Sequence, residues 1–225
     1  MIDIHSHILY GIDDGAEAIG DSVKMAVIYE VLGFKKVYCS PHVMNFYYEN
    51  DLNKVVQRCA ELQEVLNKEK IELELIPFAE VYLDESVPAK VAQKKLPVIN
   101  GKLLVEGPLN EWPPYLEEIL FAIKIYNVCP IIAHIERNRD LQKNLAKIRQ
   151  LKEGGCLIQG NILSITGYYG ASAKRCFEEL LKADLYDFLA TDMHNAENNV
   201  AMYREAMDKA KKLVGEQVKA LFKEV

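Results

Sequence analysis

Short apolar stretches alternate with amphipathic stretches along most of the chain. The apolar stretches are brief and are bounded by polar residues, glycine or proline, a pattern typical of buried strands. We predict seven such strands, over residues 1–5, 36–40, 73–79, 102–106, 130–134, 156–160 and 187–191.

Amphipathic helices are predicted between these strands, because apolar residues recur there at spacings of three and four. The clearest pattern covers residues 51–68, and Asp51 is a suitable N-cap for it. A second pattern over residues 141–151 stops before Gly154, a residue type that favours helix ends. Two further helices are expected around residues 176–181 and 200–213.

The repeated strand–helix order predicts a single α/β domain over residues 1–225, with a parallel sheet covered by helices. Closed, such a sheet is a TIM-like (β/α)7 barrel; open, it is a doubly wound sheet. In both arrangements a functional site belongs at the carboxyl ends of the strands.

Composition and charge narrow the classes of partner. The chain has 225 residues and a net charge of −6, so we expect no binding of nucleic acid through a basic surface. Its five cysteines include no CxxC pair, which favours a reduced, cytoplasmic protein. No apolar run is long enough to cross a bilayer and no signal peptide precedes the first strand, so no membrane insertion is expected.

All five histidines follow predicted strands, and carboxylates occur at the same kind of position. His5 and His7 form an HxH pair at the end of the first strand, where both rings can reach one ion only if the strand breaks its alternation. The sixth strand offers no ligand, although Gln159 or Asn161 could support the others. The candidate metal ligands are His5, His7, Asp14, His42, Glu80, Glu106, His134, Asp192 and His194.

Each candidate has an ordinary structural alternative when it is considered alone. Glu80 or Glu106 could pair with a lysine, and Asp192 could cap the last helix. Together, imidazoles and carboxylates at the ends of several strands indicate a site for zinc, iron or manganese, because cations would offset the repulsion between the carboxylates.

The motifs occur in an order that resembles a known family. HSHILYGIDDG begins at His5, AEVYLDE contains Glu80, AHIER contains His134, SITGYYG follows the sixth strand, and TDMHN contains Asp192 and His194. Over nearly the whole chain the sequence resembles the PHP superfamily, in particular the bacterial protein-tyrosine phosphatases of the capsule and exopolysaccharide type. The resemblance implies the PHP fold, which is the distorted seven-stranded barrel.

The resemblance also implies three metal ions, with manganese expected and iron or zinc as alternatives. Carried over from the family, one ion would be held by His5, His7, Glu80 and Asp192, a second by Glu80, Glu106 and His134, and a third by Asp14, His42 and His194.

The implied chemistry is hydrolysis of a phosphate monoester by a metal-bridging hydroxide. Arg137 resembles the family's arginine that clamps the phosphate, and Asp192 could supply a proton late in the reaction. A thiol nucleophile is not expected, because no cysteine lies in a CxxxxxR loop. Where several family members have a second arginine after the final DxHN, this chain has Asn199, and Arg204 lies a turn further on.

The expected substrate is phosphotyrosine of a protein, namely a tyrosine kinase that controls polysaccharide export. Tyr47 and Tyr48 are candidates for contacting its phenyl ring, with packing on the barrel rim as the alternative. Other functions stay open: a small-molecule phosphatase such as a histidinol phosphatase, a nucleic-acid-processing PHP domain, and a metal-binding module without activity. The acidic charge disfavours the second of these, and the complete ligand set disfavours the third.

Overall fold

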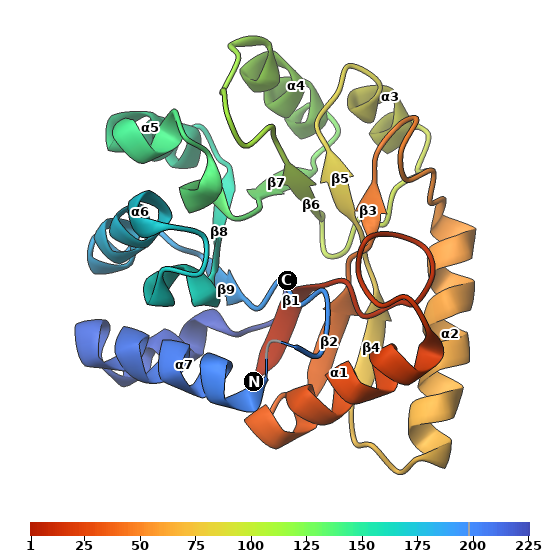
Figure 1. Cartoon of the computed structure of the whole chain (residues 1–225). Coiled ribbons are helices and arrows are strands. Elements are labelled where there is room, and N and C mark those ends of the chain that lie inside the picture. The colour runs from red at the N-terminus through yellow and green to blue at the C-terminus, as the bar shows by residue number, and fades with distance from the viewer. Residues whose placement is uncertain (198) are drawn as a thin grey trace.

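The computed structural model describes residues 1–197 and 199–225, and its named strands pair in parallel. One sheet has the order β1 (Ile2–Ser6), β2 (Lys36–Cys39) and β4 (Glu74–Pro77). The other has the order β3 (His42–Val43), β5 (Glu80–Tyr82), β6 (Lys102–Glu106), β7 (Cys129–Ile132), β8 (Leu157–Asn161) and β9 (Phe188–Ala190). Together they form a curled parallel arrangement in the middle of the molecule (Figure 1).

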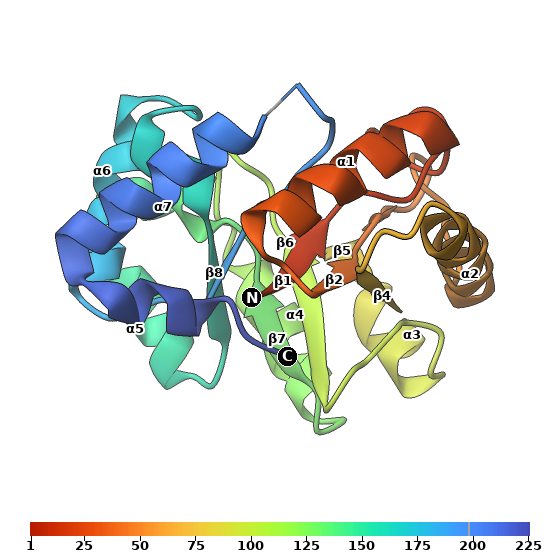
Figure 2. The same ribbon diagram turned by 90° about the horizontal axis from the view of Figure 1, so that it is seen from below.

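Helices follow the strands and lie around the outside of the curl, as Figure 1 and Figure 2 show from two sides. The α-helices are α1 (Ile19–Leu32), α2 (Leu52–Lys68), α3 (Val87–Ala92), α4 (Tyr115–Lys124), α5 (Leu145–Glu153), α6 (Ala171–Lys182) and α7 (Val200–Val214). Short 3₁₀ helices are η1 (Ile135–Arg137), η2 (Leu141–Lys143), η3 (Ile162–Thr166) and η4 (Glu216–Leu221). Asp51 caps α2 as predicted, because its side chain accepts a hydrogen bond from Lys54 N at 2.8 Å.

The third predicted strand, residues 73–79, is two strands in the structure. β4 ends at Pro77 and pairs with β2, whereas β5 begins at Glu80 and pairs with β3. Proline stands at both breaks, with Pro41 between β2 and β3, and proline cannot donate a ladder hydrogen bond. His42 and Glu80 therefore each begin a short strand, which corrects the prediction that they follow strand ends.

The helices also differ from the prediction. Residues 141–151 form η2 and α5 instead of one helix, and Asn144 caps α5 by accepting a hydrogen bond from Lys147 N at 3.1 Å. Helices α1, α3 and α4 are absent from the sequence prediction. In α1 the exposed side also carries apolar residues such as Val27 and Val31, which hide its periodicity.

Hydrophobic clusters lie on both faces of the strands. A smaller cluster takes side chains from strands of both sheets, which places it inside the curl, and its members include Ile4, Tyr38, Phe78, Leu104, Ile131 and Phe188. A larger cluster joins the strands to the surrounding helices through residues such as Met25, Leu62, Leu120 and Phe177. Among the described residues, no helix combines the length and apolar character needed to span a membrane.

Candidate metal centre

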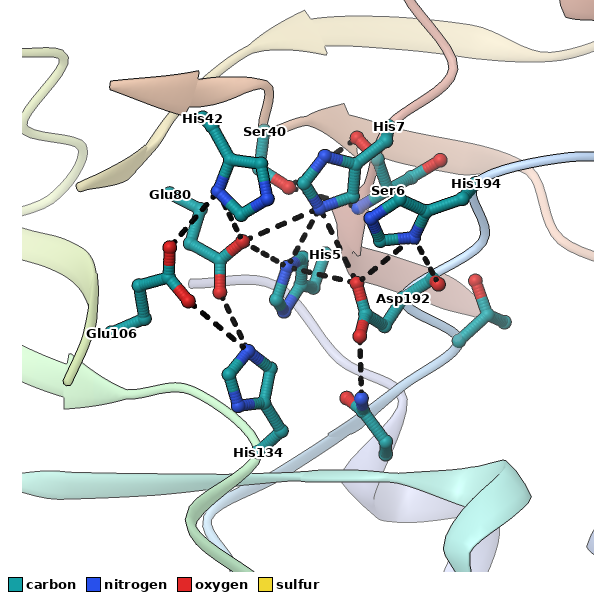
Figure 3. Close-up of polar contacts among 12 residues, drawn as sticks. His5, Ser6, His7, Ser40, His42, Glu80, Glu106, His134, Asp192 and His194 are labelled. Atoms are coloured by element: carbon teal, nitrogen blue, oxygen red, sulfur yellow. Dashed lines mark hydrogen bonds and ion pairs between the residues drawn. The ribbon is translucent and has the colours of Figure 1, made fainter. Parts of the chain in front are cut away.

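Polar side chains from both sheets meet at one end of the curl (Figure 3). The structure brings all nine candidate ligands together there: His5 from β1, His7 and Asp14 from the loop after it, His42 from β3, Glu80 from β5, Glu106 from β6, His134 after β7, and Asp192 and His194 after β9. They form four overlapping sets in which the ligand atoms lie within 4.8 Å of one another.

His5 and His7 turn to the same side because β1 is irregular at its end. The register between β1 and β2 shifts between Asp3 and Ser6, and Ser6 N bonds to the Ser40 hydroxyl at 2.9 Å. As a result the Nε2 atoms of the two histidines lie 3.2 Å apart. The break in alternation that an HxH pair requires is therefore present.

Hydrogen bonds behind the two rings determine which nitrogen faces the centre. His5 Nδ1 lies 3.0 Å from Gln159 Oε1, and His7 Nδ1 lies 2.8 Å from Asp13 Oδ2. An amide or carboxylate oxygen accepts hydrogen bonds, so each ring donates from Nδ1 and presents a lone pair at Nε2. Two facing lone pairs repel each other, and a cation between them removes the repulsion.

Glu80 and Asp192 complete this inner ligand group. Glu80 Oε2 lies 3.1 Å from His5 Nε2 and 3.3 Å from His7 Nε2, and Asp192 Oδ1 lies 3.3 Å from both. Neighbouring ligands held about 2.0–2.1 Å from one metal ion lie about 3 Å apart, which agrees with the distances from each carboxylate oxygen to the two histidines. Glu80 Oε2 and Asp192 Oδ1 are buried and make no hydrogen bond within the described residues, so the group fits a metal ion.

The electrostatic environment of the inner group also favours a cation. Burial lowers the pKa of His5, but the charges of Glu80 and Asp192 outweigh burial and raise that pKa to about 9. An environment that draws a proton onto a fully buried imidazole will draw a metal ion in the same way.

A second group shares Glu80 with the first. His134 Nε2 lies 2.8 Å from Glu80 Oε1 and 3.8 Å from Glu106 Oε2. On the opposite side, His42 Nδ1 lies 3.2 Å from Glu80 Oε2 and 3.0 Å from Glu106 Oε1. The Glu80 carboxylate thus lies between two sets of ligand atoms, the position that a bridging ligand occupies.

An outer ligand group consists of Asp14, His42 and His194, with His7 close to it. His42 Nε2 and His194 Nε2 lie 3.4 Å and 3.5 Å from Asp14 Oδ1. His194 Nδ1 donates to the Asp192 carbonyl oxygen at 3.0 Å, which leaves its Nε2 to face Asp14. The Asp14 side chain is 50% exposed, so this group lies nearer to solvent than the inner one.

Buried polar side chains on β8, which itself supplies no ligand, hold the ligands in place. Gln159 Oε1 accepts a hydrogen bond from His134 N at 3.1 Å in addition to its bond with His5, and Gln159 Nε2 donates to Asn161 Oδ1 at 2.9 Å. Asn161 Nδ2 in turn donates to Asp192 Oδ2 at 2.6 Å. Gln159 and Asn161 together therefore orient ligands from three separate segments of the chain.

Asp13 plays a similar supporting part, and the sequence analysis misses it. Its Oδ2 accepts a hydrogen bond from His42 N at 3.1 Å besides contacting His7, and its Oδ1 accepts one from Gly15 N at 2.9 Å. Gly15 is needed there, since a Cβ atom would lie 2.1 Å from the His7 carbonyl oxygen. The doubled aspartate of GIDDG was the available signal, but only the fold shows which carboxylate turns inward.

His134 and Asp192 have left-handed backbone conformations, with φ of 31° and 51°. Such conformations are unfavourable for residues other than glycine and are frequent at functional sites. Burial raises the pKa of Asp192, but His5 and other histidines lower it well below its usual value. Arg137 also donates to Asp192 Oδ2, at 3.0 Å. Asp192 is thus an ionised acceptor suited to metal binding, and its role as a proton donor stays a prediction.

A cavity of about 630 Å³ opens onto the ligands. Arg137 lines it together with Tyr168 and Tyr169, and the Arg137 guanidinium lies 4.4 Å from the centre of the Tyr169 ring. This stacking and the bond to Asp192 hold the guanidinium at the edge of the metal centre.

The other predicted substrate residues occupy different positions. Tyr48 lines the cavity and stacks on His42, whereas Tyr47 is 77% exposed and is not among the lining residues. Arg204 lies on α7 outside this cavity, where it donates to Val31 O at 3.5 Å, so it does not replace a second phosphate-binding arginine here.

Comparisons with known proteins agree with this geometry. The sequence profile of the family described as "Capsular polysaccharide synthesis, CpsB/CapC" matches residues 1–224. The chain is 32% identical to the tyrosine-protein phosphatase YwqE of Bacillus subtilis, over 97% of this chain and 87% of that protein. It is 29% identical to the putative tyrosine-protein phosphatase CapC of Staphylococcus aureus, over 94% and 84%.

Solved structures are similar as well. One match is a chain from the crystal structures of YwqE from Bacillus subtilis and CpsB from Streptococcus pneumoniae, which are described as "unique metal-dependent tyrosine phosphatases". Its TM-score is 0.90 at 31% identity, and the match covers 99% of this chain and 94% of that one. Histidinol phosphate phosphatase from Lactococcus lactis matches with a TM-score of 0.60 at 13% identity over 94% of both chains, which shows a shared fold alone. The chain therefore belongs to the CpsB/CapC family of capsular polysaccharide synthesis.

Proposed function

We propose that the chain is a metal-dependent protein-tyrosine phosphatase of capsule or exopolysaccharide synthesis. The observation that carries the proposal is the inner ligand group, in which one oxygen of Glu80 and one of Asp192 each lie 3.1–3.3 Å from the Nε2 atoms of His5 and His7, the spacing of neighbouring metal ligands. The relatives named as tyrosine-protein phosphatases, which align over almost the whole chain, support the substrate class.

We assign three metal ions to the centre, with manganese as the expected metal and iron or zinc as alternatives. Bound ions would lower the pKa of water enough to provide a nucleophile near neutral pH and would offset the charge of a phosphoryl group. The proposed ligands are His5, His7, Glu80 and Asp192 for one ion, Glu80, Glu106 and His134 for the second, and Asp14, His42 and His194 for the third. His42 faces the second and third groups with different nitrogens, so it would tie their positions together.

The chain's own side chains would position the substrate. Arg137 is held by Asp192 and Tyr169 and would grip the phosphate with its remaining N–H groups. Tyr48 and Tyr169 would wall the space for the phenyl ring. Asp192 is the candidate for a late proton transfer, although tyrosinate leaves with little help because the pKa of the tyrosine phenol is only about 10.

Finer features belong to the same proposal. A closed seven-stranded barrel is supported by two hydrogen bonds of 2.9 Å between β1 and the segment after β9, from Asp192 N to His5 O and from His7 N to Met193 O. A cytoplasmic location is supported by the five free cysteines. The family's part in capsular polysaccharide synthesis supports a tyrosine kinase of polysaccharide export as the partner.

The test combines metal analysis and substrate comparison on one preparation. We expect at least two bound ions per chain and a higher kcat/KM for a phosphotyrosine peptide than for histidinol phosphate. The Asp192→Asn variant, purified identically, controls for contaminating phosphatases. Strong preference for histidinol phosphate would establish the small-molecule alternative, and a metal content below two ions with no hydrolysis would indicate a binding module instead.

A further inference from the structure

A second groove adjoins the cavity over the metal ligands. Its volume is about 560 Å³, and it shares Leu109, Arg137 and Tyr169 with that cavity, so one wall separates the two spaces. Arg139 and Lys143 line the groove further out, and no carboxylate occurs among the described residues that line it. A ligand that enters the cavity over the metal centre therefore has a cationic groove directly beside it.

The two outer cations of this groove are not neutralised by the protein. Arg139 and Lys143 take part in no ion pair among the described residues, although Lys147 and Lys152 on the neighbouring α5 each pair with a carboxylate. The whole chain carries a net charge of −6, so this local positive charge contrasts with the rest of the molecule. Unpaired cations at the edge of a substrate cavity attract an acidic ligand.

The backbone that carries Arg139 is held in place before any ligand binds. Asn138 is buried and donates hydrogen bonds to Pro108 O at 2.6 Å and to Glu111 O at 3.0 Å. Arg139 N donates to Leu109 O at 2.8 Å. Binding at this groove would therefore require little ordering of the main chain.

The start of α6 contributes to the same groove. The first hydrogen bond of this helix runs from Lys174 N to Gly170 O at 3.1 Å, and Gly170 at the N-cap has no side chain that could accept from the earlier amides. Amide groups at a helix start favour negative ligands. A helix end alone would not define a site, but this one faces the groove that Arg139 and Lys143 line.

We propose that this groove binds the carboxylate of an acidic residue close to the phosphotyrosine in the substrate peptide. The inference rests on the proposed phosphatase function and adds a sequence preference to it. An extended peptide advances by roughly 3.3 Å per residue, so a side chain one to three residues from the phosphotyrosine would reach across the shared wall. Arg137 and Tyr169 would then separate the phosphate subsite from the carboxylate subsite.

The test measures kcat/KM for two phosphotyrosine peptides that differ only in their flanking residues, glutamate on both sides in one and glutamine in the other. We expect the wild-type protein to prefer the acidic peptide by roughly five- to tenfold, the size expected for two partly exposed ion pairs. The double variant Arg139→Gln/Lys143→Gln should lose this preference and should retain wild-type turnover of p-nitrophenyl phosphate, which has no flanking residues.

A matched control removes the same two charges elsewhere. Arg149 on α5 and Lys68 on α2 are exposed and do not line the groove, so Arg149→Gln/Lys68→Gln should keep the preference. Equal rates on both peptides in the wild type would overturn this inference, and so would a preference that survives in Arg139→Gln/Lys143→Gln. Either result would leave the proposed phosphatase function standing. If the wild-type protein hydrolysed neither peptide nor p-nitrophenyl phosphate, the proposed function would fall together with the inference.

Discussion

The inner and outer ligand groups use the same types of side chain, but the protein supports them differently. In the inner group Glu80 is 1% exposed and its ligand atoms lie 3.1–3.3 Å from their neighbours. In the outer group Asp14 and His194 are 50% and 27% exposed, and the corresponding distances are 3.4–3.5 Å. The inner rings are also fixed from behind by Gln159 and Asp13.

This difference has an energetic consequence. Buried carboxylates and facing lone pairs cannot be solvated, so a bound cation stabilises the inner group strongly. Water can solvate the outer side chains when no ion is bound. The inner ion should therefore bind more tightly, and losing it should cost more, than losing the outer one.

The largest effect is expected from Asp192→Asn. The substitution keeps the size of the side chain but removes the charge that faces His5 and His7, so the inner ion loses a ligand. We expect kcat to fall on the order of 10³-fold or more with excess metal present, because metal-assisted attack is lost. Circular dichroism should show an intact fold, and turnover near wild type would refute the assignment of Asp192.

A smaller effect is expected from Gln159→Met, because the side chain at this position does not contact the substrate. The change removes the acceptor of His5 Nδ1 while preserving side-chain volume, so metal affinity should fall roughly 10- to 100-fold. Competition with a chelator measures this affinity, and excess metal should restore most of the activity. The exposed residue Gln150 provides the control, since Gln150→Met should leave metal affinity unchanged.

Asp14→Asn tests the outer group directly. We expect the metal content to fall by about one ion per chain and kcat by about tenfold, because the weaker amide ligand replaces a half-exposed carboxylate. Metal analysis after gel filtration measures the content. A loss of more than one ion per chain would show that the outer group also supports the inner one and would contradict the contrast between them.

The ligands could be predicted because they depend on local sequence. Each of the five histidines stands near the end or start of an extended segment, and parallel segments place such positions on one edge. The split of residues 73–79 was not predicted, because the change of partner from β2 to β3 is a long-range event. The prolines near both breaks were visible, but their effect depended on which strands lay beside them.

Supporting contacts were harder to predict for a similar reason. Asp13 and Asp14 are adjacent in the sequence, and only the turn at Gly15 decides which of them faces His7. The stacking of Arg137 on Tyr169 joins segments that follow different strands, so no local pattern indicates it. What the sequence could not show is therefore the packing between loops, which orients His7 through Asp13 and holds Arg137 beside the cavity.

The smallest expected effect concerns the rim of the outer group, where two adjacent tyrosines differ in position. Tyr48 lines the cavity and stacks on His42 with ring centres 5.4 Å apart, whereas Tyr47 is exposed. Tyr48→Ala should raise KM for a phosphotyrosine peptide about threefold to tenfold through loss of aromatic contact, with metal content unchanged. Tyr47→Ala should change KM less than about twofold. Equal effects of the two substitutions would mean that the peptide contacts the exposed face of this loop as well, and an ion lost in Tyr48→Ala would show that the rim helps to hold the outer metal.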